Sequence, residues 1–190
     1  MDYRQFYDLE AYLFDTVGPR FRQEGSLDAF DFFCIVIWKA NRAKSRVARR
    51  LLACGYADLE SAVRALTSEL ASQPAARERL RCLICKWRFR LPMASAILTV
   101  LYPEEFSIYD QRVCSSLGAF AHLSVLTSFD ALWDGYQEFL CAVRQATPES
   151  LTLRERDRYL WGKAFHDQLV ADLERGFGAL APPESSPMCG

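Results

Sequence analysis

Apolar residues recur three and four positions apart through most of this 190-residue chain. This spacing is typical of amphipathic helices, and no segment shows the period-two alternation of a half-buried strand. The segment 59–70 illustrates it, with five apolar residues on one helical face: Leu59, Ala62, Val63, Leu66 and Leu70. The sequence therefore predicts an all-α protein with eight to ten helices and no internal repeat.

Capping residues and helix breakers set the limits of these helices. Ser26, Asp58, Ser128 and Thr152 are expected N-caps, and Gly118 is an expected C-terminal cap. The dipeptide Gly18-Pro19 is expected to break the first helix. The predicted helices cover residues 4–15, 27–38, 43–53, 59–70, 74–86, 94–102, 111–117, 129–145 and 152–175.

Composition narrows the class of protein. Hydrophobic residues make up 51% of the chain, which is typical of a globular protein. The longest apolar run, Phe32 to Trp38, is far shorter than the roughly 20 residues that span a bilayer. The acidic, aromatic N-terminus lacks the pattern of a signal peptide. We expect a soluble, cytoplasmic monomer with no membrane partner.

The seven cysteines are interpreted mainly as buried thiols in a reducing compartment. Cys82 and Cys85 form a C-x-x-C pair, but a metal site would need two more ligands and no second pair exists. No role is assigned to His122 or His166. We expect no metal and no cofactor.

Charge is distributed unevenly although the net charge is only −1. Residues 39–90 contain 13 Lys+Arg and 4 Asp+Glu, a net charge of +9, and the rest of the chain has a net charge of −10. A positive surface of this kind is a candidate binding site for a polyanion. The alternative is a set of solvated helix faces.

The stretch FSIYDQRV, residues 106–113, places a carboxylate directly after an apolar run. Aspartate is seldom buried without a partner, so Asp110 has two interpretations. It is an N-cap of the helix 111–117, paired with Arg112, or it is a carboxylate that the fold presents for chemistry.

Two stretches resemble the helix-hairpin-helix DNA glycosylase superfamily. In RFRLPMASAILTVLYPEEFSIYDQRV, a turn at Arg88-Phe89-Arg90 separates two helices, and a loop then leads to Asp110, where the superfamily carries its catalytic aspartate. The D-x-R-V form looks most like the archaeal 8-oxoguanine glycosylase branch. FDFFCIVIWKANRAKSRVARRLL is similar to an early helix pair of endonuclease III-like enzymes. Together these stretches cover about half the chain.

The resemblance implies a DNA glycosylase that removes a damaged or modified base from double-stranded DNA, with Asp110 as the catalytic carboxylate. Its role would be ordinary DNA repair or, as an alternative, antiviral defence by excision of a virus's hypermodified base. Such a carboxylate stabilises an oxocarbenium-like transition state and orients the attacking water. The expected base-pocket or gap-filling residues are Trp38, Asn41, Tyr109 and Trp87. The expected phosphate-binding residues are Lys39, Arg42, Lys44, Arg46, Arg88, Arg90 and Arg112.

The resemblance also implies a fold of two helical lobes with a cleft between them. Residues 26–102 would form the basic lobe with the hairpin. Residues 1–25 and 105–180 would form the other lobe, and residues 181–190 a disordered tail.

The sequence departs from the family pattern at two places. Glycines that are usual in the hairpin are replaced by arginines, and Pro92 occupies the position of the nucleophilic lysine of bifunctional members. A monofunctional enzyme is therefore expected, unless Lys39 or Lys86 reaches the site.

Several alternatives stay open. Trp38, Trp87 and Tyr109 could be core residues, and Asn41 could end a helix. The whole chain could be a non-catalytic nucleic-acid-binding module, or a helical protein–protein adaptor.

Overall fold

The structure is a computed structural model that describes residues 2–177, and this part of the chain contains helices and no strand. The prediction of an all-α protein is thus confirmed. No helix among the described residues is long and apolar enough to cross a membrane. The predicted tail, 181–190, lies outside the described residues.

The α-helices are α1 (Leu9–Tyr12), α2 (Gly18–Glu24), α3 (Ala29–Ala40), α4 (Lys44–Leu52), α5 (Leu59–Ser72), α6 (Ala76–Arg81), α7 (Leu91–Leu101), α8 (Gln111–Leu117), α9 (Phe129–Gln145) and α10 (Leu153–Glu174).

The N-terminal helices do not break at Gly18-Pro19, contrary to the sequence prediction. A short 3₁₀ helix, η1 (Tyr3–Phe6), precedes α1, and a π-helical turn, η2 (Leu13–Val17), joins α1 directly to α2. Pro19 lacks an N–H and is tolerated because it lies in the first turn of α2. Gly18 is needed here for another reason: a Cβ would approach the carbonyl oxygen of Val100 to 2.6 Å.

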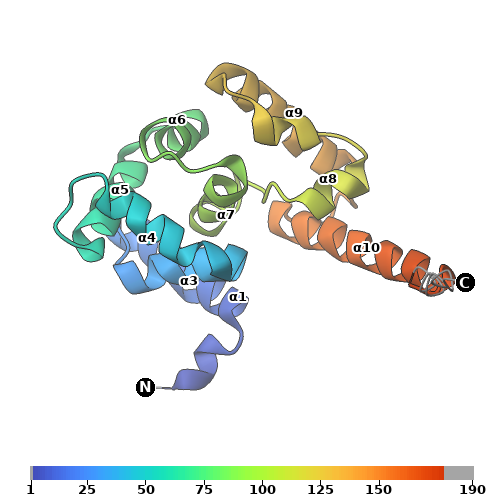
Figure 1. Cartoon of the computed structure of the whole chain (residues 1–190), viewed down its shortest axis with the longest axis horizontal. Helices are drawn as coiled ribbons and strands as arrows, with labels where there is room; N and C mark the ends of the chain where they lie inside the picture. The colour runs from blue at the N-terminus through green and yellow to red at the C-terminus, as the bar shows by residue number, and fades with distance from the viewer. Residues whose placement is uncertain (1, 178–190) are drawn as a thin grey trace, which may run out of the picture.

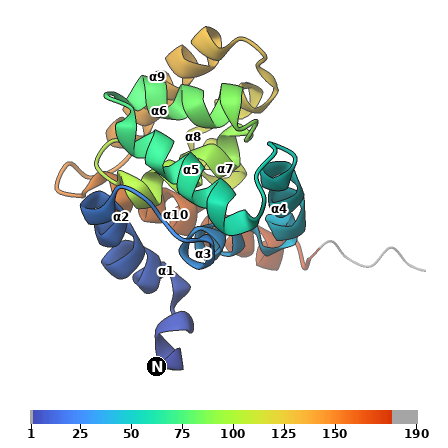
Figure 2. The ribbon, with the colours of Figure 1, turned by 90° about the vertical axis from the view of Figure 1, so that its left-hand side faces the viewer.

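Of the next three helices, α3 and α5 begin at a capping aspartate, whereas α4 has no side-chain cap. Asp28, rather than the predicted Ser26, caps α3, since its carboxylate accepts a hydrogen bond from the N–H of Asp31. A 3₁₀ turn, η3 (Asn41–Ala43), then reverses the chain into α4. Asp58 caps α5 as predicted. Figure 2 shows α4 at the edge of the molecule, beside α3 and α5.

A helix–turn–helix unit follows. The predicted helix 74–86 is divided into α6 and a π-helical segment, η4 (Cys82–Lys86). A tight turn over residues 87–90 leads to α7, which begins three residues earlier than predicted because Pro92 fits its first turn. Most residues of α7 are buried, as expected for a helix that is apolar on all sides.

The remaining helices carry the expected caps. Gly118 ends α8 in the left-handed conformation, with φ of 66°. Ser128 caps α9, and Thr152 with Glu155 forms the predicted capping box of α10. A 3₁₀ helix, η5 (Ala121–Val125), connects α8 to α9.

The helices α1–α7 lie together, and the segment 102–110 connects them to α8, α9 and α10 (Figure 1). The predicted division grouped residues 1–25 with residues 105–180. In the structure α1 and α2 pack on α3 and α7, and Glu10 of α1 also pairs with Arg154 of α10. The N-terminal helices therefore contact both groups.

Candidate functional site

Asp110 lies at the N-terminus of α8, where the sequence places it. Its backbone is extended, and its Oδ1 accepts a hydrogen bond of 3.0 Å from the backbone N–H of Arg112. Its Oδ2 lies 2.6 Å from Nζ of Lys39, which comes from the last turn of α3. The N-cap interpretation is confirmed, although the carboxylate pairs with Lys39 and not with the guanidinium of Arg112. The role of Asp110 in chemistry stays a prediction.

The apolar run before Asp110 is buried and held by polar contacts. The hydroxyl of Tyr136 donates a hydrogen bond of 2.6 Å to the carbonyl of Ser107 and accepts one from its N–H. The N–H of Tyr109 donates to Oγ of Ser95 in α7. These contacts fix the segment at both ends, so the position of Asp110 is rigid.

The ion pair with Lys39 sets the charge of the site. The Lys39 and Asp110 side chains are only 14% and 27% exposed, which limits screening by solvent. Burial raises the pKa of Asp110, but the Lys39 ammonium and the hydrogen bonds together outweigh it and lower the pKa below its ordinary value. Asp110 is therefore ionised at neutral pH.

A cavity of about 410 Å³ opens beside this pair. Its lining combines two indole rings, three carboxylates, three cationic side chains and one aliphatic residue. These residues are Trp38, Trp161, Glu10, Asp110, Asp157, Lys39, Arg154, Arg158 and Ile108.

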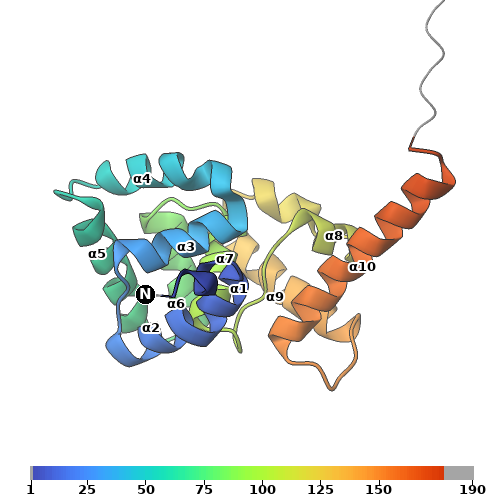
Figure 3. The same cartoon turned by 90° about the horizontal axis from the view of Figure 1, so that it is seen from below.

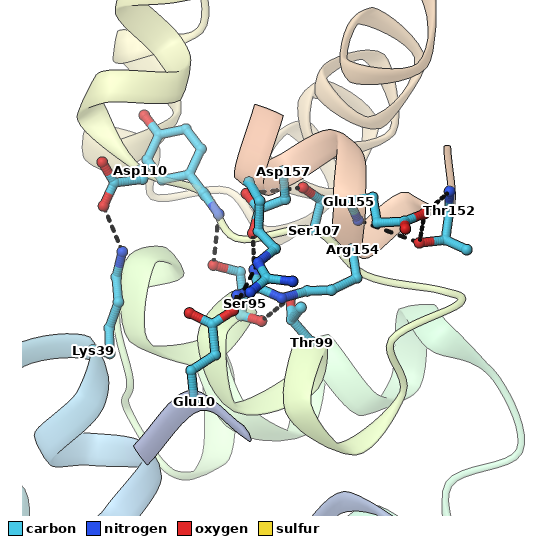
Figure 4. Close-up of polar contacts among 12 residues, drawn as sticks. Glu10, Lys39, Ser95, Thr99, Ser107, Asp110, Thr152, Arg154, Glu155 and Asp157 are labelled. Atoms are coloured by element: carbon cyan, nitrogen blue, oxygen red, sulfur yellow. Dashed lines mark hydrogen bonds and ion pairs between the residues drawn. The ribbon is translucent and has the colours of Figure 1, made fainter. Parts of the chain in front are cut away.

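Arg154 connects three sides of the cavity (Figure 4). Its Nη2 lies 2.5 Å from Oε1 of Glu10, and its Nη1 lies 2.5 Å from Oδ2 of Asp157. Its guanidinium also lies over the rings of Phe14, at 4.5 Å, and Trp38, at 5.3 Å. The cation therefore orients Trp38 while neutralising carboxylates from α1 and α10.

Asp157 differs from Asp110 in the direction in which its surroundings shift its pKa. It is 4% exposed, and burial raises its pKa to about 6 despite the nearby Arg154. Arg154 lowers the pKa less than a dedicated partner would, since its charge is shared with Glu10, and the charge on Asp110 raises it further.

A buried acid with a raised pKa makes stability depend on pH. Folded Asp157 binds its proton more tightly than the unfolded chain does, so its contribution to the unfolding free energy falls as pH rises from 3.8 to about 6. We expect Asp157→Asn to remove this contribution. Urea unfolding of both proteins across this range would measure it. An unchanged pH dependence in the variant would contradict the prediction.

The predicted phosphate-binding residues fall into two groups. Five of them lie on α4, on the turn before it or on the hairpin turn, and all five are exposed: Arg42, Lys44, Arg46, Arg88 and Arg90. Among the described residues none of these five has an acidic partner within 4 Å, and the same holds for Arg49 and Arg50. We call these seven residues the basic surface.

The basic surface is continuous between α4 and the hairpin turn. The guanidinium of Arg50 lies 5.6 Å from the ring of the buried Phe89 in that turn. Burial lowers the pKa of Arg50, and the charges of Arg46 and Arg90 lower it further. Like charges therefore converge here, whereas Arg64, Arg77 and other cations nearby are paired with carboxylates.

Two predicted phosphate-binding residues lie elsewhere. Lys39 is paired with Asp110, and Arg112 lies over the ring of Trp161, at 4.8 Å. Lys86, the other lysine considered as a nucleophile, pairs with Glu69 and does not line the cavity.

The predicted stacking residues are only partly brought together. Trp38 lines the cavity. Asn41 is exposed in η3 and accepts a hydrogen bond from Lys44. Trp87 and Tyr109 are buried in the core at 2% and 4% exposure, so the stacking role predicted for these two rings does not fit their positions.

Trp87 has a structural role that explains its burial. Its indole N–H donates a hydrogen bond of 3.0 Å to Glu69, and its ring stacks on Tyr56. We expect Trp87→Phe to lower the unfolding free energy by about 1–3 kcal/mol, because a buried hydrogen bond and part of the packing are lost. Urea unfolding of both proteins would measure it, and an unchanged free energy of unfolding in the variant would contradict the core assignment.

The sequence interpretation missed the contribution of α10. Arg154, Asp157, Arg158 and Trp161 lie three or four positions apart, so they share one face of a helix. The capping box at Thr152 located the start of this helix, and the spacing could have identified that face. Nothing in the sequence indicated that the face meets Asp110.

Comparison with known proteins gave no relatives. No family model, no curated protein and no solved structure matches this chain.

Proposed function

We propose that this protein is a DNA glycosylase that hydrolyses the N-glycosidic bond of a damaged or modified base, with Asp110 as its catalytic carboxylate. The observation that carries the proposal is the position of Asp110: an ionised carboxylate on a rigid segment, lining a cavity that also presents the rings of Trp38 and Trp161.

The chemistry follows from this position. When the N-glycosidic bond breaks, its electron pair leaves with the base and positive charge develops on the sugar. The fixed carboxylate of Asp110 stabilises that charge, and accepts a proton from the water that adds to C1′. An extruded base would stack on Trp38, whose ring Arg154 and Phe14 hold in place.

Lys39 must release Asp110 for this chemistry, because an ammonium at 2.6 Å neutralises the carboxylate. The phosphate next to an extruded nucleotide offers a competing anion. We propose that Lys39 turns to this phosphate when DNA binds, which retains the phosphate-binding role predicted from the sequence.

The basic surface supplies the proposed contact with duplex DNA. We propose that the unit from α6 to α7 is a helix-hairpin-helix, and that α1–α7 and α8–α10 correspond to two lobes. Arg88 has φ of 59°, a conformation that glycine adopts easily. In the glycosylase superfamily, glycine in the hairpin lets the backbone approach a DNA phosphate. Here the exposed guanidinium of Arg88 would contact the phosphate instead.

Replacing the carboxylate tests the enzyme directly. We expect the wild-type protein to release a base from at least one DNA in a panel of oxidised, alkylated, deaminated and hypermodified bases. Asp110→Asn should lose at least about 100-fold in rate, since the charge that stabilises the transition state is gone. Mass spectrometry of released base and alkaline cleavage of abasic sites would measure it.

Asp134→Asn is the matched control, because this exposed carboxylate of α9 does not line the cavity. It should release base at the wild-type rate. Strand cleavage without alkali would assign amine chemistry to Lys39. Equal rates for Asp110→Asn and the wild type would refute the catalytic role.

The basic surface predicts a strong dependence on salt. We expect the double variant Arg46→Gln/Arg90→Gln to reduce the slope of log affinity against log salt by about two, because about one counterion is released per phosphate contact. Arg64→Gln, whose cation is paired with Glu60, should leave the slope almost unchanged. Fluorescence anisotropy with duplex DNA at several salt concentrations would measure both slopes. Equal effects of the two changes would argue against this surface.

One observation favours a second candidate, a non-catalytic nucleic-acid-binding module. The Lys39–Asp110 ion pair neutralises the carboxylate and links α3 to α8, as a structural ion pair would. Such a module would bind DNA through the basic surface and release no base from any DNA in the panel.

A further inference from the structure

The distal half of α10 extends away from the rest of the molecule. Its buried residues end with Leu160, and no described residue of the helix beyond that point is buried. Figure 3 shows this part of α10 continuing past α8 without another helix against it. Large apolar side chains nevertheless follow one another along it: Trp161, Phe165, Leu169 and Leu173 are all exposed.

Two of these side chains form an ordered aromatic pair. The rings of Trp161 and Phe165 lie one helical turn apart, with centroids 6.0 Å apart and planes only 4° from parallel. They are 45% and 48% exposed. The guanidinium of Arg112 lies 4.8 Å from the Trp161 centroid and 5.8 Å from the Phe165 centroid. The cation and the two rings therefore form one surface.

This surface is continuous with the candidate site. Trp161 also lines the cavity, and the backbone N–H of Arg112 donates a hydrogen bond to Oδ1 of Asp110. Arg158, one turn before Trp161, also lines the cavity, and its Nε lies 3.0 Å from Oε1 of Glu10. A chain that leaves the cavity on this side would meet the two rings and the guanidinium of Arg112.

We propose that Trp161, Phe165 and Arg112 form a stacking platform for unpaired nucleotides that flank the nucleotide held in the cavity. The proposal rests on the proposed function, since it assumes that the cavity accepts a nucleotide of a DNA strand. It adds a substrate preference: DNA with unpaired nucleotides next to the target base.

The chemistry of the platform fits a single strand better than a protein. Unpaired bases expose flat faces that stack on aromatic rings whatever their sequence, and their phosphates are attracted by guanidinium groups. Bases inside a duplex offer no such faces. A protein partner or a second copy of the chain would instead have to bury the charge of Arg112, which is costly without a carboxylate opposite it.

Phe165→Ala tests the platform, because Phe165 is exposed and does not line the cavity. The probe is a labelled thymidine oligonucleotide about ten nucleotides long, and a duplex of the same length serves for comparison. We expect the variant to bind the single strand roughly tenfold more weakly, and to bind the duplex as the wild type does. Tyr159→Ala is the control: Tyr159 is equally exposed on the same helix, and it should change neither affinity.

Three outcomes would overturn the platform. These are an unchanged single-strand affinity in Phe165→Ala, an equal loss in Tyr159→Ala, or a wild-type dimer in light scattering that Phe165→Ala converts to a monomer. Base release distinguishes this inference from the proposed function. Base release with no effect of Phe165→Ala on single-strand binding would leave the glycosylase and remove the platform. Single-strand binding that depends on Phe165, without base release from any DNA, would support the platform and refute the proposed glycosylase.

Discussion

The guanidinium of Arg154 is the contact on which the candidate site depends. Two carboxylates from different helices, Glu10 and Asp157, meet at this one cation, which also lies over the ring of Trp38. Without it Glu10 would keep only Arg158, and the buried Asp157 would have no cation within 4 Å among the described residues. Breaking a buried pair in this way is strongly destabilising. Arg154 thus fixes α1, α10 and one wall of the cavity at once.

The charges around the cavity constrain what it can hold. Three carboxylates and three cations line it, so an ionised site is close to neutral overall. A neutral planar group suits this balance better than an anion or a cation. Asp110 and Asp157 also differ in pKa. The Lys39 ammonium lowers the pKa of Asp110, whereas burial raises the pKa of Asp157 to about 6. Distinct environments of this kind give two carboxylates distinct roles.

The sequence predicted local features well and tertiary ones poorly. Caps such as Asp58 and Ser128 act through their own neighbours, so pattern alone located the helices. The error at Gly18-Pro19 arose because a π-helical turn places Pro19 in a first turn, and sequence spacing does not report that. The family resemblance predicts Trp87 as a stacking residue of the site, yet packing on Tyr56 buries it. The sequence singles out Asp110 because a carboxylate directly after an apolar run is unusual. Its ion-pair partner Lys39 lies 71 residues away in the sequence, so only the three-dimensional structure shows that the two side chains meet.

The Lys39–Asp110 pair has a different consequence in each of the two proposed functions. A purely structural ion pair would gain from tighter burial, yet this one stands at the edge of an open cavity, where water and a ligand can reach it. An ammonium in that position has a second stable partner only if an anion enters, and the adjoining basic surface favours the approach of a polyanion. In the proposed enzyme, a phosphate that draws Lys39 away would leave Asp110 without its neutralising partner, and the carboxylate would present a full charge to the sugar. The ion pair with Lys39 neutralises the carboxylate in the free protein, so Asp110 would become fully charged and reactive only when DNA is bound.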